Sequence, residues 1–447
     1  MKKCRNGMRG FLSLCAGAVL AVTLSGCVSN KTTNAVSVGL ADQYFGTAGH
    51  IGRAPSWSGG VWSVTLDPAT NYFSYNDIGK VSLGTAAGYT PLNGAFTATP
   101  SGFLDLALSQ GSVSVSSSQG WTGVGGYAVS LPGEGLLMRT GSNSIDVFHN
   151  SSSALIAATN SAACPAFTSP QTYNFVAQGT TNQGDTVVHV AYGSVEITPA
   201  GADSWSFSNF AMVDQNGNAI TPSAIPDATC PATSEGLVLV SLLSNTVYAP
   251  AQITTGVSPS GLLIIDQGQN LSISNDGASS FDSAPTGPTG LMGVVKPSAA
   301  LSVSDMAGKK YAGFESDPLS PLGTIAIAFG STPGSGTAII GGGFPSDDVT
   351  KTPRADTTLD LGAQSTQTPG LFTSVTLTQP DNYSVCKGTP SGGTDSNGNS
   401  ICIYHGAAVA GQVNGKYVIF TNINDPTALN TSGATPLAAI NLVLYQQ

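Results

Sequence analysis

Residues 186–197 read TVVHVAYGSVEI and residues 204–213 read SWSFSNFAMV, two runs in which apolar and polar side chains largely alternate. Six residues that include proline and glycine separate the two runs. Alternation with a period of two places the apolar side chains on one face of a strand, and a short turn between two such runs is typical of an antiparallel hairpin. This stretch therefore predicts paired β-strands with one buried face.

Similar runs recur along the chain from about residue 43 onwards. Asn-Gly, Asp-Pro and Pro-Gly dipeptides lie between them and supply the backbone angles that tight turns need. A strand spacing of about a dozen residues is typical of antiparallel sandwiches or barrels rather than of βαβ units. The best helix candidate is SSSALIAATNSAA at residues 151–163. We predict an all-β fold of antiparallel sandwich-like or barrel-like domains, two in number, with little helix.

The composition supports the same fold class. Only 9% of the 447 residues are charged, and 21 of the 25 acidic residues are aspartate. Glutamate, lysine and arginine favour helix interiors, whereas aspartate, serine, threonine and glycine favour turns, caps or strands. A chain this poor in helix-forming charged residues is expected to consist of strands and loops.

The first 26 residues have the features of a secretory signal peptide. Four basic residues and no acidic residue accompany an apolar stretch at residues 11–24. The leader ends in LSGC (24–27), which resembles the lipobox of bacterial prolipoproteins. The resemblance implies that the leader is cut before Cys27 and that Cys27 carries acyl chains such as palmitate, which anchor the mature chain in a membrane. Residue 28 is valine and not the aspartate of the usual inner-membrane retention signal, so the resemblance implies the outer membrane.

The charge of the mature chain limits its partners. Removal of the leader leaves 11 basic and 25 acidic residues, a formal charge of −14, and residues 140–295 contain no lysine or arginine. Nucleic acids and anionic headgroups bind clustered basic side chains, so nucleic acid is excluded as a partner. Apart from the membrane that holds the acyl chains, the charge favours a neutral partner such as a glycan, a lipid or another envelope protein. Nothing in the sequence indicates a cofactor.

Four cysteines remain once the leader is removed and Cys27 is lipidated. An even number in an oxidising compartment predicts two disulfides, for which three pairings are possible. The segment between Cys386 and Cys402 has the composition of one long hairpin turn. We therefore predict a bond between these two residues, which pairs Cys164 with Cys230.

The composition also suggests where the chain divides. Residues 27–42 form a lipidated spacer, and residues 284–290, APTGPTG, form the most linker-like segment. These boundaries predict one β domain at 43–283 and a second at 291–447. The motifs TYNFVAQG (172–179) and KYAGFES (310–316) are each followed by a further β-run, which suggests duplication; the common composition of glycine-rich and serine-rich strands is an equally good explanation.

No established catalytic motif is present. The sequence contains no G-x-S-x-G, HExxH or Walker A pattern, and each of the four histidines is interpreted as a strand or loop residue. We therefore assign no catalytic residue and predict that the protein is not an enzyme. An envelope hydrolase whose groups are assembled only by folding is retained as the second alternative.

Two sets of side chains are candidates for ligand binding. Four tryptophans can form an aromatic platform for a sugar or an apolar ligand, or can belong to the core or to an interface: Trp57, Trp62, Trp121 and Trp205. The densest acidic stretch supplies weak candidates for calcium ligands: Asp347, Asp348, Asp356 and Asp360. The two D-x-N-G-N turns at 214–218 and 395–399 lack the glycine and glutamate positions of a calcium loop, so they are interpreted as Asn-Gly hairpin turns.

Parts of the chain resemble a known but uncharacterised family. The leader and the segments GLMGVVKPS (290–298) and KYAGF (310–314) are similar to Gram-negative bacterial lipoproteins of unknown function. This resemblance implies no catalytic residues and favours an outer-membrane-anchored lipoprotein that acts as a non-enzymatic binding or envelope-surface module. The chain also loosely resembles lipocalins, although their G-x-W signature is absent. The first alternative is therefore a barrel that carries a small apolar ligand.

Overall fold

The computed structural model describes the strands and some of the turns of this chain, and the structural statements below concern these residues. They are residues 42–47, 61–79, 92–99, 102–108, 125–140, 154–158, 169–178, 180–181, 188–189, 191–201, 204–214, 217, 219, 228–229, 238–241, 252–257, 261–267, 290–316, 324–329, 339–343, 354–380, 394, 398, 401–424 and 441–447. The leader, Cys27 and the spacer before residue 42 lie outside the described residues.

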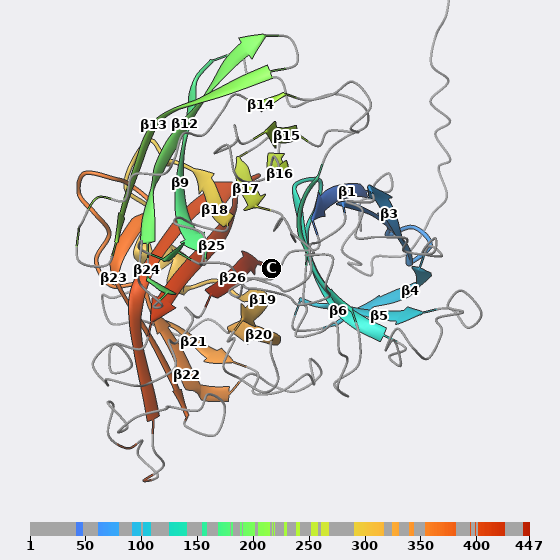
Figure 1. Cartoon of the computed structure of the whole chain (residues 1–447). Helices are drawn as coiled ribbons and strands as arrows, with labels where there is room; N and C mark the ends of the chain where they lie inside the picture. The colour runs from blue at the N-terminus through green and yellow to red at the C-terminus, as the bar shows by residue number, and fades with distance from the viewer. Residues whose placement is uncertain are drawn as a thin grey trace, which may run out of the picture. The chain divides into compact units, whose positions relative to one another are not determined.

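The first sheet is a closed antiparallel barrel of eight strands in sequence order (Figure 1, blue to cyan). Its strands are β1 (Asp42–Thr47), β2 (Val61–Asp67), β3 (Tyr72–Gly79), β4 (Leu92–Ala98), β5 (Leu104–Leu108), β6 (Gly125–Leu131), β7 (Gly135–Thr140) and β8 (Ala154–Ala158). Pairing of Tyr44 with Ala158 closes the barrel between its first and last strands. Val64, Leu66, Phe73 and Leu106 are buried on the inner face.

The second sheet is another closed antiparallel barrel of eight strands (Figure 1, green to yellow). Its strands are β9 (Gln171–Gln178), β12 (Ala191–Gly201), β13 (Ser204–Asp214), β14 (Ala228–Thr229), β15 (Val238–Ser241), β16 (Gln252–Val257), β17 (Leu262–Gln267) and β18 (Gly290–Val295). The short strands β10 (Thr180–Thr181) and β11 (Val188–His189) form a separate pair between β9 and β12. The ladder between β9 and β18 closes the barrel.

The third sheet also has eight antiparallel strands (Figure 1, orange to red). Its strands are β19 (Tyr311–Ser316), β20 (Thr324–Phe329), β21 (Ile339–Gly343), β22 (Arg354–Asp360), β23 (Leu371–Pro380), β24 (Ile401–Val413), β25 (Lys416–Asn424) and β26 (Asn441–Gln446). The strand β19 pairs with both β20 and β26, and the edge strands β20 and β21 approach each other. Within the described ranges no ladder joins these two edges, so this sheet is open where the other two are closed.

One short helix, α1 (Val303–Ala307), precedes the third sheet. The hydroxyl of Ser302 accepts a hydrogen bond of 3.3 Å from the backbone N–H of Asp305, which caps the helix at its N-terminus. The side chain of Met306 is buried in the core of the third sheet. The prediction of an all-β fold of barrel-like antiparallel sheets with little helix is confirmed.

The prediction of a helix at residues 151–163 is wrong. The described part of that segment is the strand β8, which pairs with β7 on one side and β1 on the other. Alanine favours helices when it is considered alone, but ladder hydrogen bonds on both sides of β8 close the first barrel and override that preference.

The last residue of the linker expected at residues 284–290 belongs to a strand of the second barrel. Residues 284–289 lie outside the described residues, whereas Gly290 begins β18, which pairs with β17 and β9. The division of the chain into domains 43–283 and 291–447 stays a prediction. By sheet membership the strands fall into three consecutive groups, β1–β8, β9–β18 and β19–β26.

The inner core of the third sheet is one continuous apolar cluster. It contains Phe372, Leu377, Tyr404, Ile419, Leu444 and ten other buried side chains, together with Met306 of the helix. The Tyr311 hydroxyl donates a hydrogen bond of 2.9 Å to the backbone oxygen of Met306, so the helix is held to β19 by a polar contact as well as by packing. Burial raises the pKa of the Tyr311 phenol.

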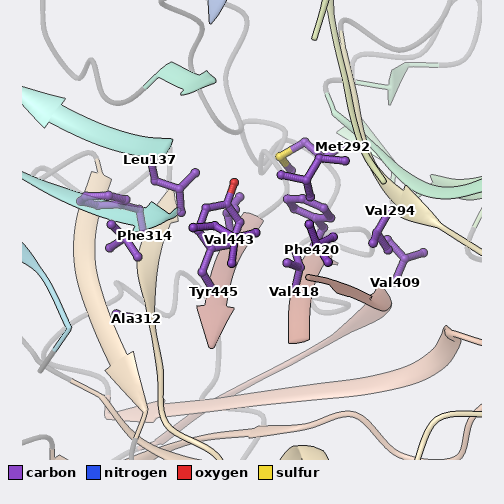
Figure 2. Close-up of a cluster of buried hydrophobic side chains, with 14 of the residues drawn as sticks. Leu137, Met292, Val294, Ala312, Phe314, Val409, Val418, Phe420, Val443 and Tyr445 are labelled. Atoms are coloured by element: carbon purple, nitrogen blue, oxygen red, sulfur yellow. The ribbon is translucent and has the colours of Figure 1, made fainter. Parts of the chain in front are cut away.

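A second core lies where side chains of all three sheets meet (Figure 2). Leu137 of the first barrel lies beside Phe314 of the third sheet, and Met292 of the second barrel lies beside Phe420. The strands β25 and β26 contribute alternate residues to the two cores, with Ile419 in the inner one and Phe420 in the shared one. This burial on both faces explains why KYVIF (416–420) and NLVLY (441–445) are nearly continuous apolar runs.

Candidate functional site on the outer face of the first barrel

The four candidate tryptophans do not lie on one sheet. Trp62 is in β2 of the first barrel, opposite Asp77 of β3. Trp205 is in β13 of the second barrel, opposite Pro199 of β12. Trp57 and Trp121 lie outside the described residues. A ligand-binding role for these tryptophans stays a prediction.

The acidic candidates for calcium binding are only partly described. Asp356 and Asp360 both lie on β22, whereas Asp347 and Asp348 lie outside the described residues. The Oδ1 atom of Asp360 accepts a hydrogen bond of 2.8 Å from the backbone N–H of Gly362, so this oxygen already has a local partner. Within the described part of the chain, no three His, Cys, Asp or Glu side chains gather closely enough to hold a metal ion. Calcium binding by this stretch stays a prediction.

Of the four cysteines expected to form disulfides, one lies within the described residues. Cys402 lies in β24 opposite Gln379 of β23, while Cys164, Cys230 and Cys386 lie outside the described residues. The strands β23 and β24 are antiparallel neighbours, with Pro380 paired to Ile401, so the segment expected to form a hairpin turn does connect two paired strands. The bonds themselves stay predictions.

Two of the four histidines are described, and they lie in different sheets. His405 is exposed on β24, and its Nδ1 atom lies 3.3 Å from the hydroxyl of Thr376 on β23. These two residues face each other across the ladder, so the contact is a cross-strand pair on an open surface. His189 lies in β11, while His50 and His149 lie outside the described residues.

The turn between β2 and β3 carries an exposed aromatic side chain. Tyr72, the first residue of β3, is 41% exposed, and among the described residues it is the one large apolar side chain that is exposed. Its neighbour Phe73 is 1% exposed because successive residues of a strand point to opposite faces. The barrel interior therefore receives Phe73, and the outer surface receives Tyr72.

Internal hydrogen bonds order this turn. The Asp67 carboxylate accepts bonds from the backbone N–H of Ala69 at 2.9 Å and from the hydroxyl of Thr70 at 2.6 Å. Asn71 adopts a positive φ of 54°, a conformation that asparagine tolerates well, and its backbone oxygen accepts a bond of 2.9 Å from Phe96 N–H. The hydrogen bond from Thr70 lowers the pKa of Asp67, with smaller contributions from the backbone. The turn is thus a defined structure that holds Tyr72 in place.

The outer face next to Tyr72 is exposed and consists of small side chains. Across the ladder Tyr72 pairs with Ala95 of β4, which pairs with Ala107 of β5, and all three are exposed. Thr97 and Asp105 form the neighbouring exposed pair. We call these five residues the Tyr72 face. It combines one aromatic ring, methyl groups, two hydroxyls and one carboxylate, and it contains no basic side chain.

The outer face of the same barrel is buried on β6 and β7. Val129, Leu131 and Leu137 are at most 1% exposed and belong to the core shared with the third sheet. Phe103, just before β5, packs edge-on against Phe314 with 6.0 Å between ring centroids. One side of the barrel wall is therefore an internal interface, whereas the five residues of the Tyr72 face on β3, β4 and β5 are exposed to solvent.

The Tyr72 face was not predicted from the sequence. The turn signals at Asp67-Pro68 and Asn71 are visible in the sequence. Which strands of a barrel face another sheet depends on packing between residues far apart in the chain, and alternation alone does not reveal it.

Comparison with known proteins gives only distant structural similarity. No known protein family and no curated protein sequence matches this chain. Isotype 1 transferrin binding protein B (TbpB) from serogroup B Neisseria meningitidis has a similar structure over 89% of this chain and 69% of its own, with a TM-score of 0.22 and 11% identity. A tryptophan-to-alanine mutant of the vaccine antigen TbpB from Haemophilus parasuis Hp5 is similar over 92% of this chain and 77% of its own, with a TM-score of 0.21 and 10% identity.

In the described ranges no helix is long and apolar enough to cross a membrane.

Proposed function

We propose that the protein is an outer-membrane-anchored lipoprotein that acts as a non-enzymatic binding or envelope-surface module. The observation that carries this proposal is the Tyr72 face, where an ordered turn presents an aromatic ring on an exposed and otherwise small-residue surface. Aromatic side chains are enriched at binding surfaces because they supply a large contact area at a low cost in conformational entropy.

The leader supports the anchoring part of the proposal. A basic region, an apolar region and LSGC (24–27) occur in the order that resembles a lipoprotein signal, and acyl chains on Cys27 would give stable attachment. The formal charge of −14 on the mature chain and the lack of basic groups on the Tyr72 face favour a neutral ligand: a glycan, a lipid or an envelope protein.

The binding part is tested with the Tyr72→Ser variant of an acyl-free form that begins at residue 28 and therefore lacks both the leader and Cys27. Burying the aromatic ring is worth about 1.5 kcal/mol, so binding to isolated envelope fragments should weaken roughly tenfold. Thr373→Ala on β23 is the matched control, because Thr373 is also exposed but lies on the third sheet. Equal binding by both variants would contradict a binding role for the Tyr72 face.

The anchoring part is tested by membrane fractionation of Cys27→Ser, with Cys402→Ser as the control cysteine variant. Cys27→Ser should keep its leader and leave the outer-membrane fraction, while Cys402→Ser should be processed normally. Unchanged processing and fractionation of Cys27→Ser would overturn the lipoprotein assignment.

The lipocalin-like carrier is a second candidate because the first two sheets close as eight-stranded barrels. Barrels of this size are filled by side chains or hold one small ligand. In the second barrel Phe175 is fully buried and stacks on Phe210 with 5.2 Å between ring centroids, so bulky rings already occupy this part of the interior. Displacement of a fluorescent fatty acid tests this function. Binding that is abolished by Phe175→Trp, which enlarges the inner ring, would favour the carrier; no binding by the native protein would exclude it.

A further inference from the structure

The start of the first barrel and the Tyr72 turn lie at the same end of that barrel. Asp42, the first residue of β1, pairs with Leu66, the penultimate residue of β2. Asp67 ends β2, and the turn at residues 68–71 leads directly to Tyr72. The chain therefore enters the barrel beside the turn that carries the exposed ring.

The covalent chain limits the distance of this end from the lipid anchor. Fifteen residue steps separate Cys27 from Asp42, and a fully extended chain of that length spans roughly 50 Å at most. The acyl chains on Cys27 lie in the membrane, so the barrel end that contains Asp42 cannot move farther than this from the headgroup layer. Of the described sheets, the first barrel is the one that the anchor reaches by the shortest length of chain.

Two other turns at this end are already held by the third sheet. In the turn between β6 and β7, Glu134 is 5% exposed and accepts a hydrogen bond of 2.7 Å from the Asn414 side chain. Next to the turn between β4 and β5, Phe103 packs against Phe314. The turn between β2 and β3 differs from both, since residues 68–72 are all exposed.

The chemistry of this turn suits the interface between lipid headgroups and water. Pro68, Ala69 and Thr70 are small, and Tyr72 combines an apolar ring with a polar hydroxyl, which is why tyrosine is enriched at membrane interfaces. From Val61 to Gly79 there is no lysine or arginine. The Asp67 carboxylate is engaged by Ala69 and Thr70 within the turn. These features favour a neutral or zwitterionic headgroup layer and give no reason for attraction to anionic lipid.

We propose that the turn of residues 68–72 rests on the phospholipid headgroup layer of the leaflet that holds the acyl chains of Cys27, with the Tyr72 ring as its interfacial contact. This inference rests on the proposed function, because it names the lipid surface as the partner of Tyr72 and requires the lipid anchor. The anchor keeps the barrel end within roughly 50 Å of the membrane, so a contact that would be weak for a free protein becomes an intramolecular one.

The experiment uses the full lipidated protein reconstituted in phosphatidylcholine vesicles. A fraction of the lipids carries bromine on the acyl chains close to the headgroup, where it quenches a tryptophan that contacts the interface. Tyr72→Trp places the reporter in the turn, and Thr373→Trp places it at an exposed site of the third sheet. Emission from the four native tryptophans is removed by subtracting the signal of the unsubstituted protein in the same vesicles.

We expect brominated lipid to quench the emission added by Tyr72→Trp and to leave the emission added by Thr373→Trp unchanged. Replacing part of the phosphatidylcholine with phosphatidylglycerol should not increase the quenching. Flotation of the vesicles shows whether the protein is anchored, so the anchoring and the contact at residue 72 are tested separately. Flotation without quenching at residue 72, or equal quenching at both sites, overturns this inference alone. Quenching that rises with anionic lipid contradicts the neutral contact, and failure to float with the vesicles overturns the anchoring as well.

Discussion

The side-chain amide of Asn414 donates a hydrogen bond of 2.7 Å to Oε1 of Glu134, although 280 positions separate the two residues in the chain. Glu134 lies in the turn between β6 and β7 of the first barrel, and Asn414 lies in the two-residue turn between β24 and β25 of the third sheet. Asn414 has a φ of 49°, which hairpin turns of this kind require, so the turn geometry aims its amide at the carboxylate. The bond connects two sheets at the edge of their shared apolar core.

This contact predicts a ranking of substitutions at Asn414. Asn414→Gly keeps the backbone preference but removes the donor from a nearly buried carboxylate, which should lower the free energy of unfolding by about 1–3 kcal/mol. Asn414→Asp should cost more, because it also places a second negative charge beside Glu134. Urea unfolding of both variants measures the difference. If Asn414→Asp is as stable as Asn414→Gly, the charge of Glu134 does not interact with a charge at position 414, and the prediction is contradicted.

Packing between the first barrel and the third sheet should be measurable at one aromatic pair. Phe103 and Phe314 are both fully buried and meet edge to face at 6.0 Å between ring centroids. Each single change to alanine is expected to lower the free energy of unfolding by about 3–5 kcal/mol, since it leaves a cavity. A double-mutant cycle should return a coupling of about 0.5–1.5 kcal/mol. Strict additivity of the two changes would argue against contact between these sheets in solution.

Gly313 of β19 should tolerate no side chain. A Cβ atom added there would overlap the backbone oxygen of Val443 in the paired strand β26. Relief of the overlap requires the two strands to separate, so Gly313→Ala is expected to cost about 3 kcal/mol or more. Gly217→Ala is the control. Gly217 has a positive φ of 81° but no atom within 4 Å of the added Cβ, so only backbone strain of about 1–2 kcal/mol is expected. Thermal unfolding of the two variants should therefore rank Gly313→Ala as the less stable.

The turn that holds Tyr72 should respond to acid through Asp67. The hydrogen bond from Thr70 favours the charged carboxylate and lowers the pKa of Asp67 below the ordinary aspartate value of 3.8. The stabilisation of the turn is therefore complete above the ordinary value and is lost as the pH falls through the lowered pKa. Thr70→Val should raise the pKa of Asp67 towards its ordinary value, as followed by NMR titration of the carboxyl carbon. Thr97→Val, an exposed change on the nearby strand β4, should leave the titration unaltered.

Local patterns predicted individual strands and turns well. SWSFSNFAMV at 204–213 lies within β13, and the glycines of the two Asn-Gly turns, Gly217 and Gly398, both have a φ of 81°. For the first of these turns, an antiparallel bridge between Val213 and Ala219 supports the hairpin interpretation. These features depend on neighbouring residues only, because alternation and positive φ are local requirements of a strand and of a turn.

Features that depend on distant partners were predicted less well. The segment at 151–163 was expected to be a helix, yet the described part is β8, which closes a barrel with a strand more than 100 residues earlier. The aromatic residues singled out in the sequence include Trp62 and Trp205, which lie in two different barrels. The exposed ring of Tyr72 and the buried rings of Phe103 and Phe314 are chemically similar. Only the neighbouring sheet decides which of them is covered.

The sequence alone determined that this protein is an all-β chain of antiparallel strands, because alternation, turn residues and the lack of helix-forming charges are all local properties. It also supplied the lipoprotein-like leader and the acidic charge on which the proposed anchoring and the expectation of a neutral partner rest. The tertiary structure decided that the strands form two closed barrels and one open sheet, and that the three sheets share a core. It likewise decided that β6 and β7 are covered while the Tyr72 face is not. Closure of the first barrel and burial of its outer side chains depend on contacts between residues more than 100 positions apart, and no local pattern encodes those contacts.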